Sequence, residues 1–203
     1  MRDKSFRFRT SIRLVSCALV ALLLLPFAAC TPSEPEHIAP PLTESQVARY
    51  TLASKAFGGE VAYMVYLPEG YSADQRYPVW YAMHGYSSTE KMWLSDTGVG
   101  KVADDLIAEG KQMPMVMVFP YTRYDDAKTI EADLADGALG PSRMERFLCD
   151  ELIPYIDAHY STIASPDGRF IGGFSMGGLF ALQIGLHQPT LFSKIGAYSP
   201  ALT

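Results

Sequence analysis

Short, nearly continuous apolar runs alternate along this chain with segments whose apolar residues have helical spacing. Such runs predict strands, and the length of the run over 77–83 suits a strand that is buried on both faces of a sheet. The runs span residues 61–67, 77–83, 115–119, 169–174 and 194–198. Helices are expected over 102–109, from Ser142 onward, and over 176–187. Because strands alternate with helices, the sequence predicts the α/β class, a three-layer helix–sheet–helix fold with a mostly parallel sheet.

The helix that follows Ser142 carries clear local signals. Ser142 and Glu145 have the spacing of a capping box, in which each side chain binds an open backbone N–H of the other residue. Pro154 lacks a backbone N–H and is expected to kink this helix. One buried apolar stripe is expected from residues that recur every four positions: Met144, Leu148, Leu152 and Ile156.

The first thirty residues have the pattern of a targeting signal. Basic residues precede an apolar run over 14–27, which is short for a membrane span and suits a signal peptide. The run ends in Phe27-Ala28-Ala29-Cys30, and small residues before a cysteine resemble the lipobox of bacterial lipoproteins. We expect a lipoprotein signal peptide over 1–29 and lipidation of Cys30, which would hold the protein at the bacterial cell envelope, facing outside the cytoplasm. An uncleaved anchor and an ordinary secretory signal are the alternatives.

Composition and charge narrow the remaining possibilities. Residues 30–48 are rich in proline and predict an extended tether, followed by one folded domain over 49–203. The net charge of −5, without a basic stripe, argues against a nucleic-acid partner. If Cys17 leaves with the signal and Cys30 is acylated, Cys149 has no disulfide partner, and we expect it to be a small buried residue of a helix.

The candidate chemistry lies at Gly173-Phe174-Ser175-Met176-Gly177, which matches the G-x-S-x-G nucleophile elbow. In this motif the serine stands on a sharp turn between a strand and a helix, and the flanking glycines permit close backbone contact. An apolar strand ends here and an apolar helix begins, as the motif requires. Ser175 is therefore the candidate nucleophile, and the N–H of Met176 is a candidate oxyanion donor.

A second donor is expected from His84-Gly85-Tyr86, which follows the strand predicted over 77–83. Acyl transfer needs two N–H groups aimed at the developing oxyanion, and the Tyr86 N–H is our choice for the second one. The alternative is an ordinary turn at the end of a strand, with His84 as a structural hydrogen-bonding residue.

Several segments together resemble the "Putative esterase" (esterase D-like) family of α/β-hydrolases, which includes feruloyl, acetyl-xylan and enterochelin esterases and mycolyltransferases. The resemblance covers residues 50–203 and rests on Met83-His84-Gly85, residues 106–111, residues 152–156 and residues 172–178. It implies that Ser175 is the nucleophile, that the N–H groups of Tyr86 and Met176 form the oxyanion hole, and that no metal or organic cofactor is needed. The substrate implied is a small-molecule or polysaccharide-linked ester.

A serine hydrolase of this fold also needs an acid and a histidine after the nucleophile. His187 is the one histidine that follows Ser175 in the sequence, twelve residues later. A continuous helix would place it ~18 Å from Ser175. His37, His84 and His159 precede Ser175. We therefore assign neither a base nor an acid. We expect the chain to be the N-terminal two-thirds of a longer esterase; a catalytically inactive truncated pseudoenzyme, a surface binding lipoprotein and an acyltransferase of the mycolyltransferase type are the alternatives.

Two surface features follow from this interpretation. The strand over 194–198 should leave an apolar sheet edge that favours association. Aromatic and basic residues after strand ends could line a substrate pocket, although ordinary surface or lid packing explains them equally well: Trp93, Tyr121, Arg123 and Tyr124.

Overall fold

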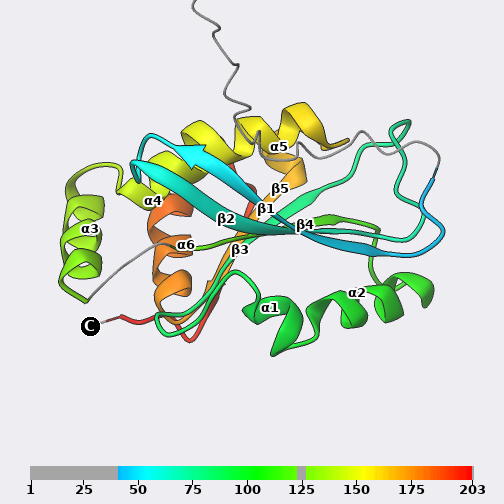
Figure 1. Ribbon diagram of the computed structural model, residues 1–203, viewed down its shortest axis with the longest axis horizontal. Helices are drawn as coiled ribbons and strands as arrows, with labels where there is room; N and C mark the ends of the chain where they lie inside the picture. The colour runs from blue at the N-terminus through cyan, green and yellow to red at the C-terminus, as the bar shows by residue number, and fades with distance from the viewer. Residues whose placement is uncertain (1–40, 123–126, 203) are drawn as a thin grey trace, which may run out of the picture. The chain divides into compact units, whose positions relative to one another are not determined.

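The computed structural model describes residues 41–122 and 127–202, and in this part of the chain it shows one mixed six-stranded sheet (Figure 1). The strand order is β1-β2-β4-β3-β5-β6. The pairs β3–β4, β3–β5 and β5–β6 are parallel, whereas β1–β2 and β2–β4 are antiparallel. The strands are β1 (Gln46–Ser54), β2 (Gly59–Leu67), β3 (Val79–Met83), β4 (Val116–Pro120), β5 (Arg169–Phe174) and β6 (Lys194–Tyr198).

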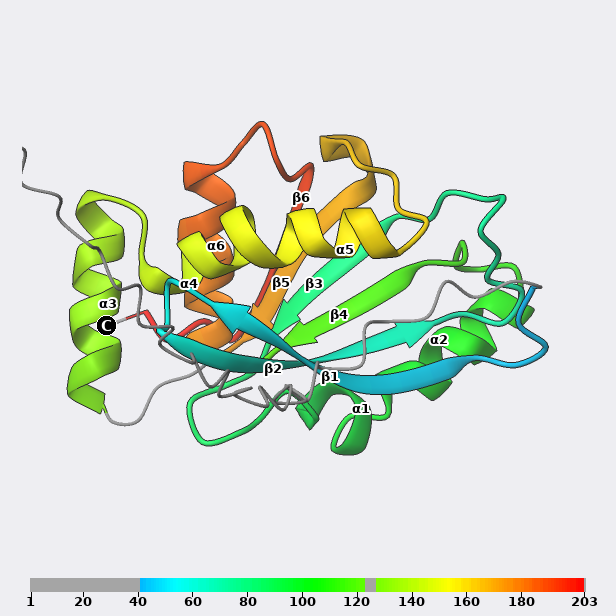
Figure 2. The ribbon, with the colours of Figure 1, turned by 45° about the horizontal axis from the view of Figure 1, so that its top comes forward.

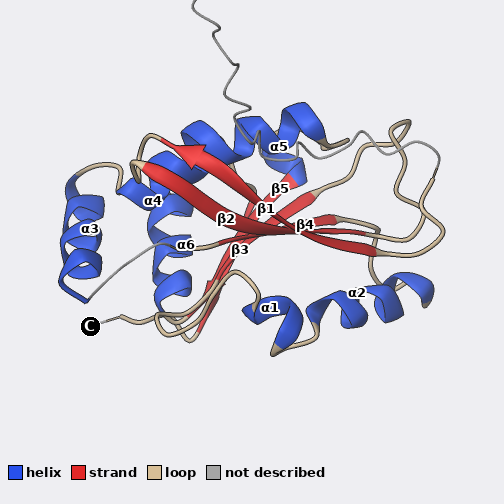
Figure 3. Ribbon diagram, viewed as in Figure 1, coloured by secondary structure: helices blue, strands red, loops and turns tan. Residues whose placement is uncertain are grey.

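Helices lie on both faces of the sheet, as Figures 2 and 3 show. One face carries α4, the π-helical turn η1, α5 and α6, and the other carries α1 and α2. Helix α3 contacts α4 and α6. The bounds are α1 (Met92–Ser95), α2 (Val99–Ala108), α3 (Ala127–Leu139), α4 (Arg143–Arg146), η1 (Phe147–Leu152), α5 (Ile153–His159), a 3-10 turn η2 (Pro166–Gly168) and α6 (Met176–His187).

Alternate residues of the strands fill two separate apolar cores. On β2, for example, Tyr63 and Val65 face α4, η1, α5 and α6, whereas Tyr66 faces α1 and α2. Each of these three side chains is at most 1% exposed. The strands therefore have an apolar layer on each side, which explains the nearly continuous apolar runs in the sequence.

The predicted elements are confirmed, several of them to the residue. Strands β5 and β6 and helix α6 have the predicted bounds, and the stripe Met144, Leu148, Leu152 and Ile156 is fully buried. Strand β1 and helices α1 and α3 were not predicted. Strand β1 lies at the edge of the sheet and alternates polar with apolar residues, so pairing with β2 decides its structure more than its own pattern does.

The predicted tether extends too far. Strand β1 begins at Gln46, so residues 46–48 belong to the sheet. Leu42 is also held by the folded domain, because it is buried and its N–H donates to the Tyr71 carbonyl oxygen at 3.0 Å. The proline-rich composition of this stretch does not reveal these contacts, which lie far along the chain.

One of the two hydrogen bonds of the predicted capping box is confirmed. The Glu145 N–H donates to Ser142 Oγ at 3.0 Å, as predicted. The Glu145 carboxylate, however, turns to the end of α6, where it binds His187 Nδ1 at 2.9 Å and Gln188 Nε2 at 2.8 Å. The imidazole and amide groups at the end of the packed neighbouring helix give this buried carboxylate two side-chain hydrogen bonds in place of one to a backbone N–H.

The predicted kink at Pro154 takes the form of a widened turn. The six residues of η1 are π-helical, and the Ile153 N–H reaches back to the Leu148 carbonyl oxygen, five residues earlier. An α-helical register would direct the Asp150 carbonyl toward the proline ring, which has no N–H to donate. The π-helical turn lets the chain continue into α5 without that clash.

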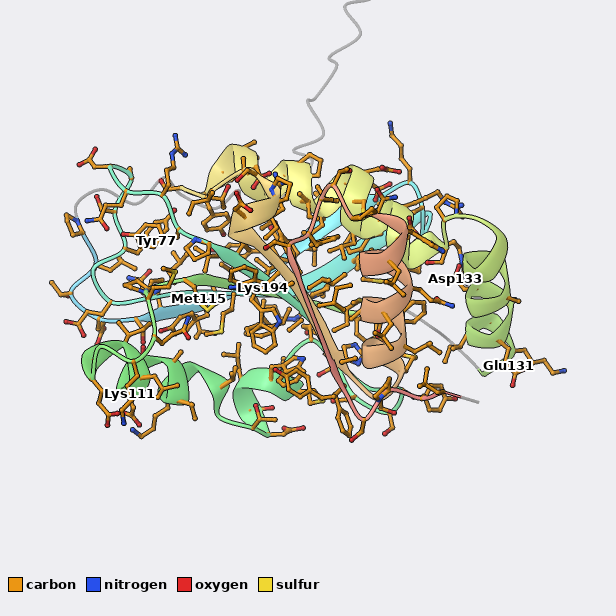
Figure 4. All side chains as sticks on the ribbon, turned by 180° about the vertical axis from the view of Figure 1, so that it is seen from behind. Tyr77, Lys111, Met115, Glu131, Asp133 and Lys194 are labelled. Atoms are coloured by element: carbon orange, nitrogen blue, oxygen red, sulfur yellow. The ribbon has the colours of Figure 1, made fainter. Side chains whose placement is uncertain are left out.

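The face that carries α1 and α2 is incompletely covered near β5 and β6. A cavity of about 500 Å³ lies there between α2 and the sheet; its lining includes Met115 and Lys194, which Figure 4 labels, together with Trp80, Val102, Phe170 and Ile195. Strand β6 pairs only with β5 in the part of the chain that the structure describes, so it is the sheet edge that the sequence predicts. The Lys194 ammonium lies 4.4 Å from the Phe170 ring centroid and covers part of this surface. Over these same residues, no helix has the length and apolar character that a membrane crossing requires.

The cavity is expected to bind the apolar aromatic part of a fluorescent dye. Val102 is 50% exposed in its lining, and Val47 on β1 is 49% exposed outside it. Val102→Glu should lower the fluorescence enhancement of 1-anilinonaphthalene-8-sulfonate by about half, because it places a charge in the apolar lining. Val47→Glu makes the same charge change elsewhere and should leave the fluorescence unchanged; equal effects of both substitutions would contradict this assignment.

Candidate active site

Ser175 stands on a strained turn between β5 and α6. Its φ of 54° and ψ of −116° lie outside the regions that residues other than glycine normally adopt. The turn is held by its backbone: the Ser175 N–H donates to the Tyr198 carbonyl oxygen at 2.9 Å, and its carbonyl oxygen accepts from Leu179 and Ala201, each at 3.1 Å. The side chain is half-buried at the N-terminus of α6, and Met176 is the first residue of that helix.

The flanking glycines allow close backbone contact, as the motif requires. A Cβ atom at Gly173 would collide with the Gly177 carbonyl group. A Cβ atom at Gly177 would lie 2.6 Å from the His84 carbonyl oxygen and would also collide with the Met83 carbonyl group. The elbow therefore packs its backbone directly on the end of β3.

Strand pairing brings the second predicted loop, at Gly85 and Tyr86, to the candidate nucleophile Ser175. Strands β3 and β5 are parallel neighbours, and Met83 pairs with Gly173. The residues that follow each strand therefore leave the sheet at the same edge. A Cβ atom at Gly85 would lie 3.2 Å from Phe174 Cδ1 and 3.5 Å from Ser175 Cβ. Ser175, Met176 and the Gly85–Tyr86 peptide thus meet at one place, and the exposed side chains of Tyr86 and Phe174 flank it.

His84 is buried beside this edge and makes hydrogen bonds to two loops. Its Nδ1 lies 2.7 Å from the Gly85 carbonyl oxygen, and its Nε2 accepts from the Thr122 N–H at 3.1 Å. The Thr122 Oγ1 also lies 3.0 Å from Nε2, and the ring stacks on Tyr121 with a centroid distance of 5.4 Å. Burial lowers the pKa of His84 below its ordinary value.

Comparison with known proteins identifies the family. The family model described as "Putative esterase" matches residues 54–203. The chain belongs to this esterase family. An endo-1,4-beta-xylanase/feruloyl esterase from Xylanibacter ruminicola is 34% identical over 166 residues, which cover 78% of this chain and 22% of that protein. Esterase Rv1288 from Mycobacterium tuberculosis is 31% identical over 152 residues, covering 74% of this chain and 31% of that protein.

The fold is that of the α/β-hydrolase esterases. The solved ferulic acid esterase from the anaerobic fungus Anaeromyces mucronatus superposes with a TM-score of 0.68 at 25% identity, over 84% of this chain and 64% of that one. In each of these three comparisons the chain spans less than two thirds of the relative's length. The family assignment confirms the resemblance inferred from the motifs.

The histidines that the structure describes bind other groups, and no hydrogen bond in this part of the chain joins one of them to the Ser175 hydroxyl. His84 binds Gly85 and Thr122. His159 donates from Nδ1 to the Tyr155 carbonyl oxygen, 2.7 Å away at the end of α5, and His187 binds Glu145. Helix α6 runs from Met176 through His187. This confirms that the His187 ring lies a full helix length away from Ser175. His37 lies outside the described residues.

The structure describes some of the remaining candidate residues, namely those of the predicted pocket and the cysteines. Trp93 is buried and donates from Nε1 to the Met83 carbonyl oxygen at 3.3 Å, and Tyr121 is half-buried on His84, so both pack beneath the site. Cys149 is half-buried in η1 rather than fully buried, and burial raises the pKa of its thiol to about 12. Arg123, Tyr124 and Cys30 lie outside the described residues.

Two polar residues near the site were missed by the sequence reasoning. Thr122 binds His84, and the buried carboxylate of Glu90 pairs with Arg49 of β1 at 2.7 Å. An isolated threonine or glutamate carries no motif, and only the strand order brings them here. The described residues hold no cluster of three or more His, Cys, Asp or Glu side chains suited to a metal ion.

The close approach at Gly177 gives a direct test of this geometry. Gly177→Ala should lower the free energy of unfolding by about 1–3 kcal/mol, because the new Cβ must displace backbone carbonyl groups. Gly140→Ala is the matched control, since a Cβ atom there meets nothing within 4 Å. Urea unfolding measures both variants, and equal stabilities would contradict the described packing of the elbow on β3.

Proposed function

We propose that this chain carries the nucleophile and the oxyanion hole of a serine carboxylic-ester hydrolase, in which Ser175 forms an acyl-enzyme. The observation that carries the proposal is the strained Ser175 conformation at the start of α6, with the Gly85–Tyr86 peptide beside it. Strain of 1–3 kcal/mol at a residue other than glycine persists only where the surroundings enforce it. Here it lifts the hydroxyl to the edge of the sheet, beside the positive end of a helix.

The chemistry divides ester hydrolysis into two steps. The Ser175 oxygen attacks the ester carbonyl carbon and loses its proton to a base, and the N–H groups of Tyr86 and Met176 stabilise the negative oxygen of the tetrahedral intermediate. The C–O bond to the alcohol then breaks, and the leaving oxygen takes up the proton. In the second step water attacks the acyl-enzyme, which releases the carboxylic acid and restores the serine hydroxyl.

The base and its acid partner belong, in this proposal, to a segment of a longer parent enzyme outside residues 41–122 and 127–202. The partial coverage of the relatives supports this view, because each of them extends well beyond the matched region. The described histidines are held at other carbonyl or carboxylate groups, which also supports it.

The substrate class we propose is an ester of an aromatic or acetyl group on a plant polysaccharide. Two relatives support the aromatic ester by name, the xylanase/feruloyl esterase and the fungal ferulic acid esterase, and a structure of the latter holds ferulic acid. The exposed aromatic side chains of Tyr86 and Phe174 next to Ser175 suit a planar acyl group.

Labelling with a fluorophosphonate probe tests the role of Ser175. Intact and peptide mass spectrometry should find a slow adduct on Ser175, which Ser175→Ala abolishes. Ser199→Ala is the matched control, since Ser199 is the other described serine with a positive φ, 45°, and its loss should leave labelling unchanged.

The pH dependence of the same reaction tests the missing base. Without a base, the labelling rate should rise about tenfold per pH unit between about pH 7 and about pH 9, because only hydroxide deprotonates the serine. A histidine base would instead give fast labelling that levels off above its pKa. Fast labelling with such a plateau would contradict the claim that the base lies outside the described residues.

We further propose that the protein is a lipoprotein of the bacterial cell envelope, facing outside the cytoplasm. The basic and apolar pattern of residues 1–30 supports this location. Expressed in a bacterial host, the chain should be recovered in the membrane fraction with an acyl mass increment on Cys30. Cys30→Ser should abolish the increment, whereas Cys17→Ser should not; an unmodified Cys30 in the mature protein would contradict the proposal.

A further inference from the structure

We propose that His84 is a positioning residue, whose imidazole holds the Gly85 carbonyl group so that the Tyr86 N–H faces the oxyanion of a substrate on Ser175. This inference rests on the proposed function of Ser175, which it deepens. It concerns a residue that acts through the peptide group next to it and does not itself contact the substrate.

The hydrogen bonds at His84 fix which ring nitrogen carries the proton. The Thr122 N–H can only donate, so Nε2, 3.1 Å away, must present its lone pair. The neutral ring therefore carries its proton on Nδ1. The Gly85 carbonyl oxygen can only accept, and at 2.7 Å it receives that proton. One tautomer satisfies both partners, and the other satisfies neither.

The bond to Gly85 sets the direction of the next N–H group. In a trans peptide the carbonyl oxygen and the following N–H point in opposite directions within one plane. Because His84 holds the Gly85 oxygen on its own buried side, the Tyr86 N–H is directed away from His84. Gly85 lies against Ser175, with a Cβ position only 3.5 Å from Ser175 Cβ. The Tyr86 N–H, which points away from the protein interior, is therefore directed toward the space above Ser175.

Neighbouring elements hold the ring in place. Thr122 and the stacked ring of Tyr121 come from the two residues that follow β4, and β4 is the parallel neighbour of β3. The ionisable groups near the ring are the buried Glu90, whose charge raises the pKa of His84, and Arg49, which is paired with Glu90. Burial outweighs Glu90 and leaves the pKa of His84 lowered, so the ring stays neutral at and above neutral pH. Protonation would place a hydrogen on Nε2 opposite the Thr122 N–H.

Two conservative variants distinguish the hydrogen bond that His84 donates to Gly85 from the one that it accepts from Thr122. The side-chain amide of His84→Asn can place an N–H donor where Nδ1 stands, and His84→Gln can place an acceptor where Nε2 stands. His84→Ala provides neither. His159→Asn is the matched control, since His159 also binds a carbonyl oxygen through Nδ1 at 2.7 Å, but at the end of α5 that leads to the opposite edge of the sheet.

Nuclear magnetic resonance tests the arrangement without any reactivity of Ser175. Long-range ¹H–¹⁵N correlation of the unmodified protein should show His84 as the neutral Nδ1–H tautomer at neutral pH. The Tyr86 amide resonance should stay close to its position in His84→Asn and move in His84→Gln. An Nε2–H tautomer, or a Tyr86 amide that is the same in all variants, would overturn the inference even if Ser175 proves unreactive.

The labelling rate with the fluorophosphonate at saturating probe then tests the consequence. Loss of one oxyanion donor lowers rates by about 10²–10³-fold, so His84→Ala and His84→Gln should label about tenfold to a hundredfold more slowly than the unmodified chain. His84→Asn should recover most of this loss, and His159→Asn should show none. Circular dichroism confirms that each variant is folded; should His84→Ala or His84→Gln fail to fold, the tautomer and the His84→Asn rate decide.

The outcomes separate the two proposals. An unmodified chain that never labels at Ser175 contradicts the proposed function, and the resonance experiment still decides the hydrogen-bond arrangement. A chain that labels at Ser175 with equal rates in His84→Gln and His84→Asn contradicts the positioning role and leaves the proposed function intact.

Discussion

The pairing of β3 with β5 is the constraint on which the rest of the site depends. These strands are parallel neighbours although about ninety residues separate them, and their register sets Met83 opposite Gly173. The loops that follow therefore leave the sheet side by side, one with Ser175 and the other with Gly85 and Tyr86. A slip of one residue in this pairing would exchange the faces of every side chain and separate the two loops.

The register of β3 and β5 forms the site only because the backbone segments at their ends contact each other closely. Glycine at 173, 177 and 85 allows the elbow, the start of α6 and the end of β3 to approach more closely than side chains permit. The strain at Ser175 is maintained by the hydrogen bonds of its N–H and carbonyl groups to Tyr198, Leu179 and Ala201. Strand β6 thus contributes to the candidate site as well as to the sheet, because its last residue, Tyr198, holds the Ser175 backbone.

Buried polar groups connect the elements around this centre. His84 joins the end of β3 to the end of β4, and Glu145 joins α4 to the far end of α6. A buried polar group that lacks a partner costs about 1–3 kcal/mol, so each of these pairs favours one arrangement of the elements over its alternatives. By contrast, mostly apolar side chains line the cavity between α2 and β6, which the described residues cover only in part.

The sequence by itself determined the α/β class, the order of most elements and the elbow at Ser175. These features have local causes: short apolar runs, a four-residue apolar repeat, and glycines at fixed distances from a serine. The tertiary structure decided the position of β1 in the sheet, the partner of Glu145, the π-helical turn before Pro154, and the hydrogen-bond partners of Thr122 and His84. These depend on contacts between residues far apart in the chain, where strand order and packing outweigh local preference. The sequence offered His84 either as part of an oxyanion loop or as a structural hydrogen-bonding residue, and only the tertiary structure shows that its ring binds Gly85 and Thr122.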